Sequence, residues 1–442
     1  MTELNKNILK LAVPAIFNNI TVPLLGLSDT AISGHLGYDS FLAAMAVGAM
    51  MFNVIFMLCG FLRMGTTGLS ALANGAGNAA MTRDVLRNSV VIAASIGAAV
   101  LIFHNLLAEL LLRLISPDTN VAEEALRYFN IVVWSVPPQL AVMACSGWFI
   151  GCRNTLIPMI VGISVNIVNI ALSVISVFGL GYGFAGIAFG TLAANWFGLF
   201  LMLFFVVGHL RRMATTGEAG RQPQIDGKVG WGRFFRINTN LFFRSACIMA
   251  VSLTMTAVGA RLGETTLAAN SVMLQFFIFF SYFMDGFAFA GEALVGNAAG
   301  ASDKKSLHAT VAALVRWGVG LSISFALIYF LCGKPIVSRL TDSDAVRLAV
   351  SEMSSWLVAL PVVTVWAFIF DGVFIGLART APLLVATLIA SSVFATVIFA
   401  GHFVSAGHFN DILWGAFETY LLLRGVLLAG KYLKLRRKSL IL

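Results

Sequence analysis

Long runs of apolar residues, separated by short polar connections, repeat along the whole chain. There are about twelve of them, and each is close to the roughly 20 residues that a helix needs to cross the hydrocarbon core of a bilayer. The expected membrane-spanning runs are residues 11–33, 41–65, 88–112, 125–150, 157–179, 184–208, 235–260, 266–291, 309–332, 353–377, 382–403 and 411–431. Backbone amides in lipid must be hydrogen-bonded within the segment, and no alternating ten-residue pattern suggests a barrel. The sequence therefore predicts an all-α polytopic membrane protein with twelve transmembrane helices and a lipid bilayer as its surroundings.

The composition excludes two other classes of protein. Of the 442 residues, 59% are hydrophobic and 11% are charged, whereas a soluble domain carries about 25% charged residues. Too few polar side chains remain to cover a water-soluble surface, and so hydrophobic a chain is not expected to be disordered. The five cysteines show no CxxC spacing, so neither a disulfide framework nor a zinc site is expected. We also expect no removable signal peptide, because the short polar segment Met1–Lys10 runs into an apolar stretch without a small-residue cleavage signal.

The Lys and Arg residues outside the apolar runs are unevenly distributed over the connections. Nineteen lie in the termini and the even-numbered connections, and six lie in the odd-numbered connections. Positive residues are retained on the cytoplasmic side of a membrane, so both termini are expected in the cytoplasm, with the chain in a bacterial inner (plasma) membrane. Topology thus accounts for the net charge of +9, and no nucleic-acid partner is expected.

The longest polar connection, residues 209–233, lies almost midway along the chain. It predicts a division into an N-terminal six-helix lobe (1–208), a cytoplasmic linker (209–233) and a C-terminal six-helix lobe (234–442).

An internal repeat supports this division. Residues 42–76 align with residues 267–301 at a constant offset of 225, sharing LAA at the start and a glycine-containing tail of small residues. Parallel repeats around a central cavity are typical of transporters that work by alternating access.

We single out eight charged residues in or directly beside the apolar runs. Inside a membrane span, a charge costs about 2.5–3.5 kcal/mol on insertion scales. Each therefore requires a partner, a wet cavity or a function. For Arg316 and Arg424 we expect structural neutralisation between helices, or extension of the side chain to the membrane surface, so both are left out of the candidate site. The other six are Arg63, Arg244, Asp29, Asp285, Glu292 and Asp371.

Asp29 is the strongest candidate for ion coupling. It lies far along the first run, six residues after Pro23, which removes a helix hydrogen bond and favours a bend. A carboxylate in a low-dielectric cavity is protonated more readily than in water, so it can take up a proton from one side and release it on the other. Arg63 is the candidate charge partner in this half. The alternative is a carboxylate that only caps or salt-bridges the helix end.

Asn166, Asn169 and Ser173 share one face of the fifth run, and Thr191 in the sixth could face them. Such a polar stripe predicts either a functional network or ordinary hydrogen bonding between membrane helices.

In the second half, Asp285 and Glu292 lie seven residues apart on one face of the eighth run, and Arg244 in the seventh could reach either. With Asp371 they form a candidate charged group, which is either structural or a gate that changes partner during transport.

Enzyme motifs are absent from the sequence. No Walker A loop, HExxH helix, GxSxG elbow or strand-linked GxGxxG is found. We therefore expect no enzyme activity, no metal and no cofactor, and energy that comes from an ion gradient.

Several segments resemble the multidrug and toxic compound extrusion (MATE) family, and within it the bacterial DNA-damage-inducible-F (DinF) branch. They are LAVPAIFNNITVPLLGLSDTAISGHLG (11–37), FLRMGTTGLSALANGAGN (61–78), GARLGETTLAANSVM (259–273), YFMDGFAFAGEALVG (282–296) and FDGVFIGLART (370–380). The resemblance implies two pseudo-symmetric six-helix lobes in a V, and export of amphiphilic or cationic compounds in exchange for H⁺ or Na⁺.

The resemblance also implies roles for particular residues. Asp29 occupies the position of the family's helix 1 protonation site. The family's helix 5 often reads Asn-x-x-x-Asp, with a Thr on helix 6; Asn169 and Thr191 match this pattern, but Ser173 stands where the Asp would be. A Na⁺ site there loses a charged oxygen ligand, which favours H⁺ coupling through Asp29.

The resulting hypothesis is a monomeric, proton-coupled efflux antiporter in which protonation of Asp29 bends helix 1 and displaces an amphiphilic or cationic substrate. The alternatives are a Na⁺-coupled drug antiporter with the ion in the second half, a lipid-linked saccharide flippase of similar architecture, and a non-transporting membrane scaffold.

Overall fold

The computed structural model describes residues 3–35, 39–215, 230–401 and 409–438, and within these ranges every regular element is a helix. The chain forms two compact units, one made of residues 13–231 and the other of residues 1–12 together with 232–442. Most of the predicted linker 209–233 lies outside the described residues.

The first unit contains the helices up to residue 215, with the start of α1 belonging to the second unit. Its helices are α1 (Glu3–Gly34), α2 (Asp39–Cys59), α3 (Phe61–Gly75), α4 (Ala79–Ile102), α5 (His104–Ile115), α6 (Thr119–Val132), the 3₁₀ turn η1 (Val133–Ser135), α7 (Val136–Gly151), α8 (Leu156–Val174), the π turn η2 (Ile175–Gly179) and α9 (Phe184–Thr215).

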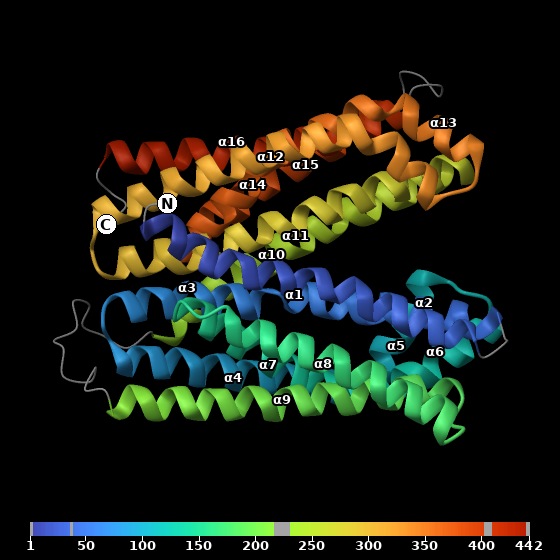
Figure 1. Ribbon diagram of the computed structural model, residues 1–442, viewed down its shortest axis with the longest axis horizontal. Helices are drawn as coiled ribbons and strands as arrows, with labels where there is room; N and C mark the ends of the chain where they lie inside the picture. The colour runs from blue at the N-terminus through green and yellow to red at the C-terminus, as the bar shows by residue number, and fades with distance from the viewer. Residues whose placement is uncertain (1–2, 36–38, 216–229, 402–408, 439–442) are drawn as a thin grey trace. The chain divides into compact units, whose positions relative to one another are not determined.

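The second unit is built from fewer and longer helices, which run side by side in Figure 1. They are α10 (Trp231–Arg261), α11 (Glu264–Gly300), α12 (Lys304–Leu340), α13 (Asp344–Glu352), α14 (Ser354–Gly376), α15 (Ala381–Gly401) and α16 (Phe409–Arg437).

Twelve stretches of the described chain are long and apolar enough to cross a membrane, which confirms the predicted all-α class and number of spans. The third span differs in position from the expected 88–112, because it covers Ala79–Ile102. Residues 104–115 form the separate helix α5, since α4 ends at Ile102 and the backbone of the next residue, Phe103, no longer has helical geometry.

The packing inside each unit repeats at the offset of 225 residues found in the sequence. Gly147 on α7 lies against the backbone of Arg63 on α3, and Gly372 on α14 lies against the backbone of Ala288 on α11. Each glycine and each contacted residue is 225 positions from its counterpart. Glycine is needed at both crossings because a Cβ would collide with the neighbouring backbone, which cannot move aside.

The two copies differ in one helix. In the first, α2 ends at Cys59 and α3 begins at Phe61, with one tightened turn at Gly60, where the amide of Gly60 donates to the carbonyl of Met57. The backbone of Gly60 stays in the right-handed helical region, and residues 40–75 form one span. In the second copy, α11 is regular through Asp285, the counterpart of Gly60.

Replacing Gly372 by alanine is expected to destabilise the protein by about 1–3 kcal/mol, the usual cost of overpacking. The added Cβ would lie 2.9 Å from Cα of Ala288, which is closer than real contacts allow. Gly430→Ala on α16 is the matched control, since nothing lies within 4 Å of its Cβ position and alanine favours a helix over glycine. Melting temperatures in detergent should fall for the first variant only, and equal values would contradict the close crossing.

Candidate functional site

Asp29 lies near the C-terminal end of α1, and its side chain is buried in the first unit. Only 6% of the residue is exposed, and its Oδ1 has no hydrogen-bond partner among the described residues. Ser33, one turn further along, is fully buried, and its Oγ likewise has no partner there. A buried carboxylate oxygen without a donor is costly when charged, so this position favours the protonated acid unless another ligand arrives.

A chain of polar side chains from three other helices lies beside Asp29. Tyr128 on α6 interacts electrostatically with the Asp29 carboxylate and is hydrogen-bonded to Thr191 on α9. Asn169 on α8 donates from Nδ2 to Oγ1 of Thr191 at 3.1 Å, and Ser173 Oγ donates to Oδ1 of Asn169 at 3.3 Å. The structure thus brings Asp29, Thr191, Asn169 and Ser173 into one region, with Tyr128 as the connection.

Tyr128 was missed in the sequence because a single tyrosine in an amphipathic stretch is ordinarily a packing residue. Its ring is held by aromatic contacts with Phe52 and Phe184, at centroid distances of 6.3 and 5.9 Å. It also lies against Gly48, where a Cβ would approach its ring to 2.6 Å. This packing fixes the position of the phenol relative to the carboxylate.

Two other predicted members lie apart from this group. Asn166 donates from Nδ2 to the backbone carbonyl of Thr21 at 3.2 Å, and so connects α8 to α1 next to Pro23. Arg63 is half-buried on α3, and its backbone carbonyl accepts a hydrogen bond from Thr67. Because Oδ1 of Asp29 has no partner, Arg63 does not provide one to that oxygen.

In the second unit, Asp371 lies between two arginines. Oδ2 of Asp371 accepts from Nη2 of Arg244 on α10 and from Nη2 of Arg424 on α16, the latter at 2.6 Å. Nη1 of Arg424 also donates to the Tyr420 hydroxyl at 3.3 Å. All three charged residues are at most 8% exposed. Three helices are therefore joined at one carboxylate oxygen.

The triad adds Arg424 to the predicted charged group, from which the sequence-based prediction had left it out. Of the two courses expected for Arg424, the structure shows neutralisation between helices. Arg244 pairs with Asp371, which was predicted as a member of the same charged group together with Asp285 and Glu292. By contrast Arg316 is exposed, with its Nε near the carbonyl of Ala312, as expected for a side chain that extends outward.

Three other acidic residues in the helices of the second unit are buried or half-buried. Glu292 is buried and Asp285 half-buried, both on α11. Glu418 on α16 is 6% exposed, with no hydrogen-bond partner for Oε1 among the described residues. Sequence reasoning missed Glu418, although its position inside an apolar run carries the same burial cost that singled out Asp29.

The two units therefore differ in the charge around their buried carboxylates. The triad of Arg244, Asp371 and Arg424 carries a net charge of +1, so Asp371 is poorly suited to bind a metal cation. Oδ1 lacks a hydrogen-bond partner among the described residues in both Asp29 and Asp371, but only Asp371 is paired with arginines there. Within the described ranges, no group of three or more His, Cys, Asp or Glu side chains could hold a metal ion.

Comparisons with known proteins agree with this arrangement. The chain is 34% identical over 430 residues to DNA damage-inducible protein F of Escherichia coli, covering 97% of this chain and 92% of that protein. It is 26% identical to a probable multidrug resistance protein NorM of Thermotoga maritima, covering 81% of this chain and 76% of that protein. The fold matches the crystal structure of the Vibrio cholerae MATE transporter VcmN in the bent form, with a TM-score of 0.84, 19% identity and coverage of 99% and 98%.

The MatE family model matches residues 14–175 and 241–400, which together make up most of the chain and fall one in each half. The match includes Asp29 with Tyr128, Asn169 and Ser173, and Arg244 with Asp371. Together with the identity to the E. coli protein, it shows that the chain belongs to the MatE (MATE) family, whose members are membrane transporters rather than enzymes and need no cofactor.

Proposed function

We propose that the chain is a secondary active antiporter that exports amphiphilic or cationic compounds in exchange for protons, with Asp29 as the coupling residue. The observation that carries this proposal is the buried Oδ1 of Asp29, which has no hydrogen-bond partner in the described structure, together with the electrostatic interaction between Asp29 and Tyr128. The similarity to a probable multidrug resistance protein supports an export function.

The distribution of charge supports the proton over Na⁺. A Na⁺ site needs several hard oxygen ligands, with enough negative charge to replace water. Around Asp29 the other side chains are neutral hydroxyls and amides, and Ser173 supplies no second carboxylate. Asp371 is engaged by two guanidinium groups. A proton requires only one carboxylate and a change in its surroundings.

Coupling requires that the proton and the substrate favour different states of the same carboxylate. A cationic or amphiphilic substrate favours ionised Asp29, and protonation removes that preference. Pro23 lies in the middle of α1, six residues before Asp29, and leaves one backbone carbonyl of the helix without its usual donor. Bending of α1 at this point on protonation would reduce the space in the first unit and displace the substrate.

The location and lobe boundaries follow from the same proposal. We place the protein in a bacterial inner membrane as a multi-pass monomer, with both termini and the linker 209–233 in the cytoplasm. Residues 1–208 and 234–442 are then the two six-helix lobes that alternate access.

The test is efflux of a fluorescent cation from proteoliposomes under two separate imposed gradients. A pH gradient alone should drive efflux, and a Na⁺ gradient at equal pH should not. An uncoupler that dissipates the pH gradient should stop transport. Efflux driven by Na⁺ alone would show that the coupling ion is Na⁺, and cation movement without any gradient dependence would contradict antiport.

A further inference from the structure

A cavity lies within the second unit, and none of its lining residues belongs to the triad of Arg244, Asp371 and Arg424. It has a volume of about 1140 Å³ and is lined by three consecutive helices, α12, α13 and α14. Within this unit, Figure 1 shows α13 at the end opposite to the two chain termini. No residue of the proposed coupling site lines this cavity.

The interior of the cavity is apolar because of the residues that line it. Tyr329, Val337 and Leu357 form buried parts of the wall, while Phe330 is 71% exposed and Val362 is 45% exposed. The space exists because small residues, including Gly333 and Ala359, stand where larger side chains would fill it. Exposed apolar side chains on membrane-spanning helices face hydrocarbon, so this wall suits an acyl chain.

The polar side chains that line the cavity are cations and hydroxyls. Two cations, Lys334 and Arg347, and four serines, Ser338, Ser351, Ser354 and Ser355, line the cavity, whereas none of its lining residues is acidic. Lys334 is exposed and has no hydrogen bond or ion pair with another described residue. The Ser338 hydroxyl already donates to the carbonyl of Pro335 at 2.8 Å, which leaves the hydroxyls of the other three serines as donors. A flexible ammonium beside hydroxyl donors favours a phosphate group.

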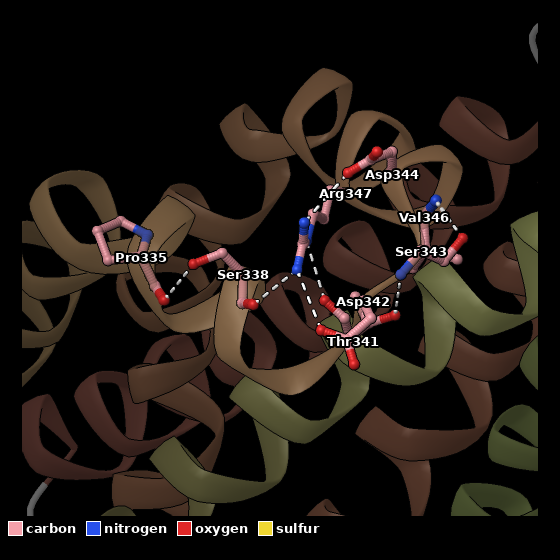
Figure 2. Close-up of polar contacts among 8 residues, drawn as sticks. All are labelled: Pro335, Ser338, Thr341, Asp342, Ser343, Asp344, Val346 and Arg347. Carbon is pink, nitrogen blue, oxygen red and sulfur yellow. Dashed lines mark hydrogen bonds and ion pairs between the residues drawn. The ribbon is translucent and has the colours of Figure 1, made fainter.

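Arg347 has a different role, because its guanidinium already forms hydrogen bonds and ion pairs within the protein (Figure 2). Nε donates to the carbonyl of Thr341 at 2.9 Å, and Nη2 donates to the carbonyl of Ser338 at 2.9 Å. Nη1 pairs with Asp344 at 3.1 Å, and Nη2 lies 3.5 Å from Asp342. Arg347 thus fixes the turn between α12 and α13, while Lys334 keeps its charge available at the cavity.

We propose that this cavity binds one phospholipid of the surrounding bilayer, with its phosphate at Lys334 and the serine hydroxyls and an acyl chain along the apolar wall. Inorganic phosphate would leave the apolar wall unused. A neutral hydrocarbon would leave Lys334 without a counter-charge. A phospholipid satisfies both parts of the lining, and this proposal does not depend on the coupling ion or on Asp29.

The test uses the full-length protein, stripped of lipid in detergent and titrated with phosphatidylglycerol, with bound lipid counted by native mass spectrometry. The wild type should retain one lipid more tightly than the rest. Lys334→Gln should weaken this binding about fivefold, as expected for the loss of one cation near a phospholipid headgroup. Ala359→Phe should abolish it by filling the cavity. Lys305→Gln, at the other end of α12, is the matched control and should bind as the wild type does.

Three results would overturn the proposal. The first is unchanged retention in both Lys334→Gln and Ala359→Phe, with their melting temperatures showing that both are folded. The second is equal binding of diacylglycerol and phosphatidylglycerol, which would show that the phosphate is not recognised. The third is displacement of the lipid by millimolar inorganic phosphate, which would show a free-anion site.

Discussion

Asp29→Asn is expected to abolish efflux driven by a pH gradient while leaving the protein folded. Asparagine has nearly the same shape and needs no proton to be neutral, so the buried site loses its exchangeable proton without a new burial cost. Efflux in proteoliposomes should fall to the rate of protein-free liposomes. The melting temperature in detergent should be unchanged or slightly higher, because a carboxylate oxygen without a partner is replaced by a neutral group.

Asp84→Asn is the matched control for this experiment. Asp84 is an acidic residue of the same unit, but its side chain forms an ion pair with Arg87 at 3.2 Å and is partly exposed. It should transport at the wild-type rate. Wild-type efflux from Asp29→Asn would show that another group carries the proton. Glu418 is another buried carboxylate with an oxygen that lacks a partner among the described residues, and it would then be the next residue to test.

Asp371→Asn is expected to lower the free energy of unfolding by about 3–5 kcal/mol, the cost of removing one partner from a buried ion pair. The substitution removes the carboxylate that joins two buried guanidinium groups, those of Arg244 and Arg424. Arg424→Met should cost less, because the pair of Arg244 and Asp371 remains. Unfolding by SDS in mixed micelles measures both variants against the wild type.

Asp342→Asn provides the surface comparison for the triad. Asp342 is fully exposed and lies 3.5 Å from Arg347. Loss of its charge should therefore leave the free energy of unfolding unchanged, as is usual for exposed ion pairs. If Asp371→Asn unfolds like the wild type, the triad is not structural, and its arginines are free to change partner during transport. If Arg424→Met lowers the free energy of unfolding as much as Asp371→Asn does, the assumption that the pair of Arg244 and Asp371 persists without Arg424 is wrong.

The positions of the membrane spans could be predicted from the sequence because their cause is local. Each span needs enough consecutive apolar residues to cross the bilayer, and its backbone hydrogen bonds lie within the segment. Likewise Asn169 and Ser173 are one helical turn apart, so their shared face follows from helix geometry alone. Asp29 was found because a charge inside an apolar run is costly whatever lies near it.

The tertiary structure decided which charges meet. Asp371 pairs with Arg244 across 127 residues of sequence and with Arg424 across 53, and no local pattern encodes contacts of that range. The same holds for Tyr128, whose position beside Asp29 depends on how α6 packs in its unit. The cavity at Lys334 likewise arises only where three helices approach.

The repeat at an offset of 225 residues depends on both the sequence and the tertiary structure. The sequence contains paired glycines at 147 and 372, but only the tertiary structure shows that each allows close contact with the backbone of a neighbouring helix. Spacing and hydrophobicity determined that the chain forms twelve helices in a membrane, because each helix satisfies its own backbone. The partners of the buried polar groups were decided by packing, because each of those groups has to be satisfied by a side chain from a distant part of the chain.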